Sequence, residues 1–276
     1  MSTVRQQSLI FPREHGAWGI LLVPLVTGAS VGLLDGGSAA ALPPLTIAVL
    51  ALFWMRTPLE SWIGTTPIKA RSSAEATLVR NATLMLGAVA MAALIWLFWG
   101  FRNLALWQIG AGAATAFLAQ MLIRKVWRGA RTTAQLVGAA GLTSVAAAAY
   151  YVVAGQLNGT AWSLWAANFL FAANQIQYVQ LRIHAARALR SQKLALGRAF
   201  FAAQFVLMGL LILACISQLF RWYAALAFLP LLLRGFAWFA QDSETLVVQA
   251  LGKRELAHAI AFGVLLIAGF HFSGIS

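Results

Sequence analysis

Long apolar runs of helical length recur along almost the whole chain, and they constrain its fold more than any other feature. The first run, residues 17–34, reads AWGILLVPLVTGASVGLL and contains no charged residue. Because a helix rises about 1.5 Å per residue, roughly 20 apolar residues cross the ~30 Å hydrocarbon core of a bilayer. Nine such runs can be drawn, at 17–34, 42–62, 82–99, 104–123, 134–154, 161–183, 200–219, 222–239 and 255–272. The pattern predicts one all-α domain, residues 1–276, folded as a polytopic transmembrane bundle of nine helices.

Composition supports this class of protein. Hydrophobic residues make up 61% of the chain and charged residues only 10%, whereas a soluble domain has about 25% charged residues. The runs show no ten-residue alternation of the kind found in membrane β-barrels. In the first run, Gly28 and Gly32 form a GxxxG pair, which predicts a close contact with a neighbouring helix. The one cysteine, Cys215, excludes a disulfide framework within the chain.

The net charge of +13 follows the predicted membrane topology. If the N-terminus is cytoplasmic, all 20 lysines and arginines except Arg102 and Arg221 fall in inner segments. Cytoplasmic segments of membrane proteins carry such an excess of positive charge. The charge therefore sets the orientation of the bundle, and we do not expect a nucleic-acid partner.

Four polar clusters lie at the inner ends of the predicted helices, and the outer ends have no comparable group. They are Arg13, Glu14 and His15 before the first helix, Arg56 to Glu60 at the end of the second, residues 174–190 at the end of the sixth, and Arg234 with Asp242 and Glu244 after the eighth. Polar side chains are costly in lipid unless they face a cavity, a partner or water. A one-sided set predicts a cavity that opens to the cytoplasm.

The sixth helix gives this cluster a helical pattern. Gln177 and Tyr178 follow Asn174 by three and four residues, and His184 follows Gln177 by seven, so these residues share one face of the helix. Arg182, Arg187 and Arg190 follow along the chain, nearer the water. This order suits an amphipathic anionic ligand whose head group is bound by arginine and whose apolar tail lies deeper.

Candidate roles follow from these clusters. The predicted substrate-binding residues are Arg13, Arg56, Asn174, Gln177, Tyr178, Arg182 and Arg187. The predicted catalytic residues are Glu60 and His184 as proton carriers, with Glu14 and His15 closing the pocket. No metal site is predicted, because neither His15 nor His184 has a second ligand at i+4.

A structural interpretation competes with these roles. Polar residues in membrane bundles often bond to neighbouring helices, and we favour this for Gln175 and Gln180. Basic residues near the helix ends are interpreted as orientation charges, namely Arg71, Arg80, Arg124, Lys125, Arg128, Arg131, Arg187, Arg190, Lys193 and Arg198. The functional interpretation rests on the coincidence of four clusters.

Residues 11–28 read FPREHGAWGILLVPLVTG, and they resemble the opening of the YwiC-like family of bacterial membrane proteins. The run PREHGAW, residues 12–18, is the specific part of the resemblance. Length and predicted helix count also fit that family. The resemblance implies a multi-pass protein of the bacterial cytoplasmic membrane.

A more distant likeness concerns architecture. Nine helices with polar inner ends on the second and sixth look like the UbiA superfamily of intramembrane prenyltransferases, in which aspartate-rich motifs at those ends bind a prenyl diphosphate through magnesium. The motifs would fall at residues 56–64, RTPLESWIG, and 174–184, NQIQYVQLRIH. Glu60 is the one acid in these two segments, so the sequence does not favour a magnesium–diphosphate site.

Three functional classes remain open from the sequence. The favoured one is a pocket for an isoprenoid or other lipid phosphate, with a UbiA-like lipid-directed transferase as the expected activity if the protein is an enzyme, and with no cofactor. The second class is a transporter or permease for a small anion. The third is a non-catalytic subunit of a respiratory membrane complex. The chain contains no P-loop, HExxH or GxGxxG motif that would indicate another chemistry.

Overall fold

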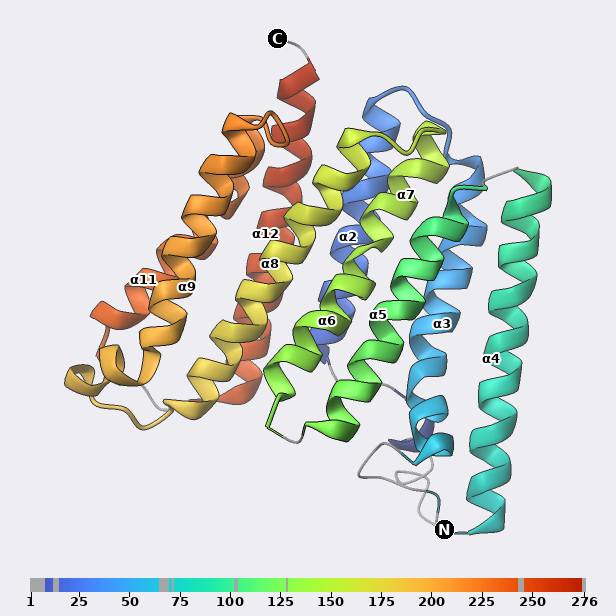
Figure 1. Ribbon diagram of the computed structural model, residues 1–276, viewed down its shortest axis with the longest axis horizontal. Coiled ribbons are helices and arrows are strands. Elements are labelled where there is room, and N and C mark those ends of the chain that lie inside the picture. Colours follow the sequence, from blue (N-terminus) through green and yellow to red (C-terminus); the bar gives the residue numbers. More distant parts are fainter. Residues whose placement is uncertain are drawn as a thin grey trace.

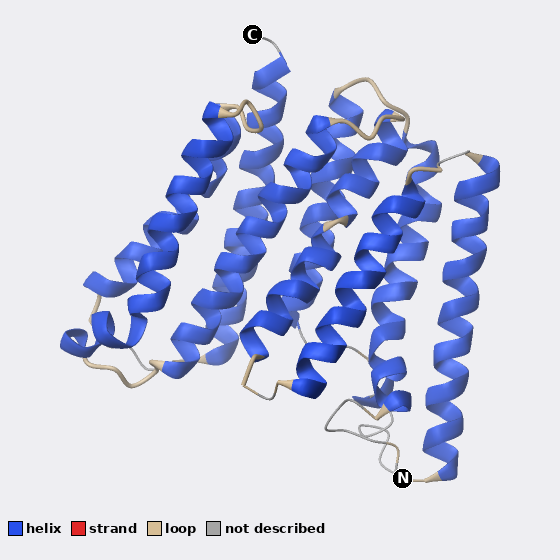
Figure 2. Ribbon diagram, in the orientation of Figure 1, coloured by secondary structure: helices blue, strands red, loops and turns tan. Residues whose placement is uncertain are grey.

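The computed structural model is helical, with no strand, across the residues that it describes, which are 8–11, 15–64, 70, 72–101, 104–127, 129–242 and 246–274 (Figures 1 and 2). The side chains of residues 15–17 and 273–274 lie outside this description. The helices are α2 (His15–Leu34), α3 (Leu42–Ile63), α4 (Ser73–Gly100), α5 (Leu106–Val126), α6 (Arg131–Thr143), α7 (Val145–Ala154), α8 (Gly159–His184), α9 (Arg190–Ile216), α10 (Trp222–Ala225), α11 (Leu229–Ala240) and α12 (Val248–Gly274). The predicted all-α class is confirmed.

Each of the nine predicted ranges is occupied by helix. The helices α6 and α7 together form the fifth range, and α10 and α11 form the eighth through a 3-10 turn at Leu226–Phe228. The chain runs up and down the bundle, and α2 begins at the opposite end of the molecule from the end of α12 (Figure 1). Seven of these units are long and apolar enough to cross a membrane by length and composition. The described apolar part of α2 is shorter, and α8 is not among the seven because its second half is polar.

Several helices begin earlier than predicted at the inner end of the bundle. The helix α4 begins at Ser73 instead of residue 82, α9 at Arg190 instead of residue 200, and α12 at Val248 instead of residue 255. An apolar run marks only the part of a helix that lies in hydrocarbon, whereas the helix itself continues into the polar region. At α4 the start is fixed by Ser72, whose hydroxyl accepts a 3.2 Å hydrogen bond from the backbone N–H of Glu75.

Helix α2 lies at the centre of the bundle and packs against α7, α8 and α12. Its contact with α7 is the closest, because Gly28 lies directly against the backbone of Ala146 and Gly32 lies against Val153. Buried residues from both helices belong to the main core cluster. The predicted role of the GxxxG pair in close helix packing is confirmed.

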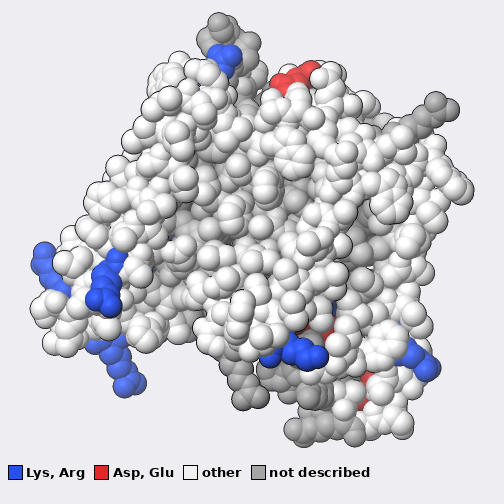
Figure 3. All heavy atoms as spheres, in the orientation of Figure 1, with Lys and Arg blue, Asp and Glu red and all other residues white. Residues whose placement is uncertain are grey.

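Positive charge is concentrated at one end of the bundle. Apart from Arg221, every lysine and arginine in the described part of the chain lies in the half where α2 begins. In Figure 3 most blue side chains lie along the lower edge, at that end. The long apolar sides of the bundle carry little charge, as lipid-facing surfaces do.

The α2–α7 contact predicts a sharp difference between two glycines of α2. A Cβ atom at Gly28 would overlap the Ala146 carbonyl, whereas a Cβ atom at Gly19 meets nothing within 4 Å. We expect Gly28→Leu to lower the free energy of unfolding by about 1–3 kcal/mol or more, because backbone cannot move as a side-chain tip can. Thermal unfolding in detergent measures this, with Gly19→Leu as the matched control. Equal melting temperatures for the two variants would contradict the assigned contact.

Candidate functional site

A cavity of about 420 Å³ lies between the α3–α4 hairpin and the α5–α6 hairpin, with α7 behind it. This volume is within the range of ligand pockets, roughly 300–1,000 Å³. Its walls are almost entirely apolar. They are formed by Leu21, Leu45, Ala48, Val49, Leu52, Phe53, Met55, Arg56, Leu59, Leu94, Leu106, Ile109, Gly110, Ala113, Ala114, Phe117, Gln120, Gly138, Gly141, Leu142, Ser144, Val145 and Ala148.

Small residues line this space on α5 and α6, and those on α6 let α5 pack closely, since Gln120 and Ala116 of α5 occupy the space that a Cβ atom at Gly138 or Gly141 would need. Gly110, Ala113 and Ala114 line the α5 side at helical spacing, and Gly138 and Gly141 line the α6 side. On the opposite wall α3 contributes larger side chains. Helix α3 packs closely against α4 and not against α5. The cavity is therefore a gap between two hairpins.

The inner end of the cavity carries the charged side chains of the second predicted cluster. Arg56 Nε donates to Glu60 Oε1 at 2.9 Å, and Arg124 Nη1 of α5 lies 3.5 Å from the same oxygen. The side chains of Arg56 and Glu60 are 17% and 11% exposed, and that of Arg124 is 36% exposed. Glu60 therefore bridges α3 and α5 at this end. Arg124 was interpreted as an orientation charge, and its pairing with Glu60 had no signal in the sequence because 64 positions separate them.

The chain just before α2 also reaches the inner end of α3. Trp54 Nε1 donates to the carbonyl of Ile10 at 3.1 Å, and the Phe11 ring lies 4.9 Å from the Trp54 ring. Leu9 is fully buried. The candidates Arg13 and Glu14 lie outside the described residues, and so does the His15 side chain, although the backbone of His15 begins α2.

A second polar group joins α8, α11 and α12. Arg234 forms an ion pair with Glu255, places Nη2 3.5 Å from Asn174 Oδ1, and lies 4.0 Å above the centre of the Tyr178 ring. Arg182 Nη1 donates to the Tyr178 hydroxyl at 3.2 Å. The side chains of Arg234 and Glu255 are only 9% and 8% exposed. Through Arg234 these contacts form one network that connects α8, α11 and α12.

The acidic partner of Arg234 differs from the prediction. Asp242 lies 3.7 Å from Arg190 and is largely exposed, and Glu244 is outside the described residues. Glu255 takes the place at Arg234 because α12 begins a full two turns before it and carries it into the bundle. In the sequence Glu255 is the first residue of the apolar run 255–272, which predicts it at the start of a helix and not inside one.

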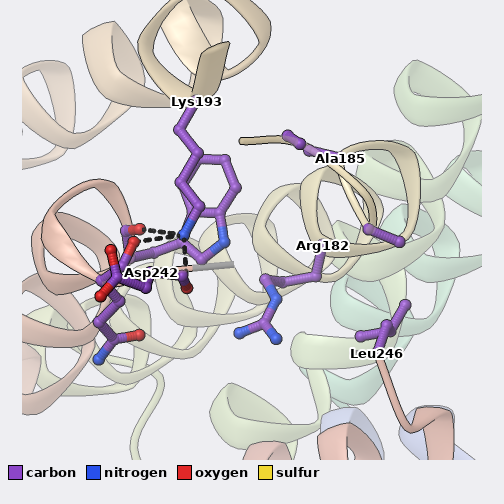
Figure 4. Close-up of a pocket in the computed structure, with 9 residues that line it drawn as sticks. Arg182, Ala185, Lys193, Asp242 and Leu246 are labelled. Carbon is purple, nitrogen blue, oxygen red and sulfur yellow. Dashed lines mark hydrogen bonds between the residues drawn. The ribbon is translucent and has the colours of Figure 1, made fainter. Parts of the chain in front are cut away.

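Lys193 is buried in the first turn of α9, so its predicted placement in a loop is wrong. Its Nζ donates to the carbonyls of Trp238, Gln241 and Asp242 at 3.1, 2.8 and 3.3 Å. The ammonium thus satisfies the carbonyl end of α11, where a cation is favoured by the helix dipole. Figure 4 shows these bonds, with Arg182 on the other side of a small pocket. That pocket holds about 20 Å³, which is space for about one water molecule.

The remaining candidates of α8 divide between packing and exposure. Gln180 accepts from Thr132 at 2.6 Å and donates to Gln135 of α6, and Gln175 donates to the Glu255 carbonyl at 3.0 Å. The predicted interhelical role of these two glutamines is confirmed. Gln177 is half-buried, and His184 and Arg187 are exposed at the end of α8.

The structure arranges the predicted residues as two groups instead of one pocket. Arg56 and Glu60 belong to α3 with Arg124 of α5, whereas Asn174, Tyr178 and Arg182 belong to α8 and face α11 and α12. Helix α8 packs on α6, α7, α2 and α9, and α3 packs on α4 and α7. In the described part of the chain, the apolar cavity adjoins only the first group.

Comparison with known proteins places the chain in a family. The model of the YwiC-like protein family matches residues 11–150, just over half of the sequence. The chain belongs to the YwiC-like family. The matched segment contains every residue that lines the cavity as well as Arg56, Glu60 and Arg124, whereas Asn174, Arg234 and Glu255 follow it. No curated protein and no solved structure matches the chain.

The role of Lys193 predicts that its loss destabilises the α9–α11 contact. We expect Lys193→Met to lower the free energy of unfolding by about 2 kcal/mol or more, because three carbonyls lose a charged donor. Thermal unfolding in detergent measures the loss. Lys253→Met, on the exposed side of α12, is the matched control. A variant at 193 as stable as the control would contradict the capping role.

The buried ion pair predicts strong non-additivity. Glu255→Leu alone leaves the Arg234 charge buried, and we expect a loss of about 3–5 kcal/mol. The double variant Glu255→Leu with Arg234→Met removes both charges, so it is expected to recover most of that stability. The free energies of unfolding of the unmodified protein, Glu255→Leu and the double variant are measured by titration with a denaturing detergent. A double variant no more stable than Glu255→Leu would show that the charges do not act as a pair.

Proposed function

We propose that this YwiC-like protein binds an amphipathic anionic lipid, with the apolar chain in the α3–α5 cavity and the head group at Arg56 and Arg124. The observation that carries the proposal is that a largely apolar cavity of about 420 Å³ is lined at its inner end by Arg56, which is linked through Glu60 to Arg124. Ligand pockets commonly combine apolar walls with a few polar groups that fix orientation.

The charges at the inner end suit an anion. Two guanidinium groups share one carboxylate there, so the described trio has a net charge of +1. Guanidinium groups bind phosphate and carboxylate oxygens through paired hydrogen bonds. The amide of Gln120, which also lines the cavity, adds a neutral donor and acceptor.

The proposal includes the membrane arrangement predicted from the sequence. All nine helical units cross the bilayer, α2 and α8 included, in a UbiA-like bundle with a cytoplasmic N-terminus in the bacterial inner membrane. Support comes from the alternating direction of the helices and the one-sided positive charge of the described residues. The polar half of α8 is compatible with a membrane position because its side chains pair with α6, α11 and α12.

A lipid-directed transferase is the reaction that we propose for this site. In this reaction an acceptor hydroxyl forms a bond to the transferred lipid group as the bond from that group to its phosphate breaks. The phosphate leaves as an anion held by Arg56 and Arg124, and Glu60 takes the hydroxyl proton. In the described part of this site Glu60 is the one carboxylate, and one carboxylate offers too few oxygen ligands for a magnesium–diphosphate centre. The outer end of the cavity is walled by leucines, Leu45, Leu94 and Leu106, which favours a lipid ligand over passage of a small anion.

The head-group assignment is tested by removing one charge at a time. We expect Arg124→Gln and Arg56→Gln to lower the fraction of protein that carries a bound anionic lipid by about tenfold or more, since a charged hydrogen bond is worth about 1.5–3 kcal/mol. Native mass spectrometry of the purified protein measures this fraction. Lys125→Gln removes an exposed charge next to Arg124 and is the matched control. Equal lipid retention in all three variants, or no specific lipid on the unmodified protein, would overturn the proposal.

A further inference from the structure

The cavity has an apolar side opening between α3 and α5. Among the residues that line it, Leu52 of α3 is 43% exposed, and Gly110 and Ala114 of α5 are also exposed. The deeper lining residues Leu45 and Ala48 are buried. A ligand in the cavity would therefore touch both the protein interior and the space outside the bundle.

The surface around this opening faces hydrocarbon. Both α3 and α5 belong to the units that are long and apolar enough to span a membrane. On α5 the neighbouring side chains Leu118 and Leu122 are 64% and 62% exposed, as is usual for lipid-facing residues. The opening is thus continuous with the part of the bilayer that holds lipid tails.

The water-facing end of the same cavity is differently built. Glu60 ties Arg56 and Arg124 together there, and this contact joins α3 to α5. An apolar chain that entered from the water would have to pass these charges, at a high desolvation cost. A chain that enters from the side meets only Leu52, Gly110 and Ala114.

We propose that the ligand is a bilayer lipid with a singly charged phosphodiester head group, and that its tail enters sideways between α3 and α5. This rests on the proposed function, because it specifies the ligand and the route for the same cavity. Among the described residues at this end, Arg56, Glu60 and Arg124 sum to a charge of +1, which a singly charged head group balances. The lipid keeps its head at the inner surface and moves only its tail from the bilayer into the gap.

Two glycines of α5 allow a matched test of the route. A Cβ atom at Gly110 or at Gly112 meets nothing within 4 Å, and both positions are exposed, but only Gly110 lines the cavity. Leucine at either position replaces a residue of low helix propensity with one of high propensity, so neither variant is expected to lose stability. Only Gly110→Leu places a side chain across the opening.

The experiment uses full-length protein in nanodiscs of phosphatidylcholine mixed with vesicles that contain deuterated phosphatidylglycerol. Native mass spectrometry follows the fraction of protein that carries the labelled lipid over time. We expect the unmodified protein and Gly112→Leu to take it up, and Gly110→Leu to take up at least about tenfold less. Melting temperatures confirm that all three proteins are folded.

The outcomes separate the two proposals. If Gly110→Leu takes up labelled lipid as Gly112→Leu does, the sideways route is overturned while the site itself stands. In a parallel experiment the vesicles contain deuterated phosphatidylcholine instead. If that lipid is retained as well as phosphatidylglycerol, the assignment of an anionic phosphodiester head group is overturned. If the unmodified protein retains neither lipid, the proposed function fails and this inference fails with it.

Discussion

The close contact between α2 and α7 is the packing constraint on which the rest of the bundle depends. Gly28 and Gly32 let the two backbones approach without intervening side chains. In a bilayer the hydrophobic effect does not drive helices together, so such van der Waals contact and hydrogen bonds must do so. Helix α2 also packs on α8 and α12, and α7 forms the back wall of the cavity. Through α2 and α7, this pair of glycines therefore helps to position α8 and α12 as well as the back wall of the cavity.

The two polar groups of the inner end differ in how deeply they are buried. Glu255, Asn174 and Tyr178 each contact Arg234, and this group is nearly closed to solvent. Arg56, Glu60 and Arg124 are more exposed and adjoin an open cavity. Buried charges that pair with each other specify an arrangement of helices, whereas partly exposed charges beside a cavity remain able to exchange one partner for another.

The helical bundle was accessible from the sequence because apolar length and positive charge are summed over many residues. The same property explains the errors at helix starts, since the polar turns of α4, α9 and α12 carry no apolar signal. The candidate site was less predictable. Helical spacing correctly placed Asn174 and Tyr178 together, but it contained nothing about Glu255 or Lys193, whose partners come from other helices. The cavity was also hidden, because Gly110 borders it through the side chain that it lacks.

The division of the cavity wall between two hairpins has a mechanical consequence. The α3–α4 pair and the α5–α6 pair each pack closely within themselves. They also contact each other at both ends of the cavity, through Glu60 and Arg124 at the inner end and through the stacked rings of Phe98 and Trp107, 4.9 Å apart, at the outer end. Between these two contacts the walls of the cavity are apolar. The protein therefore fixes the length of the cavity at both ends, whereas the width between the contacts depends on van der Waals packing alone.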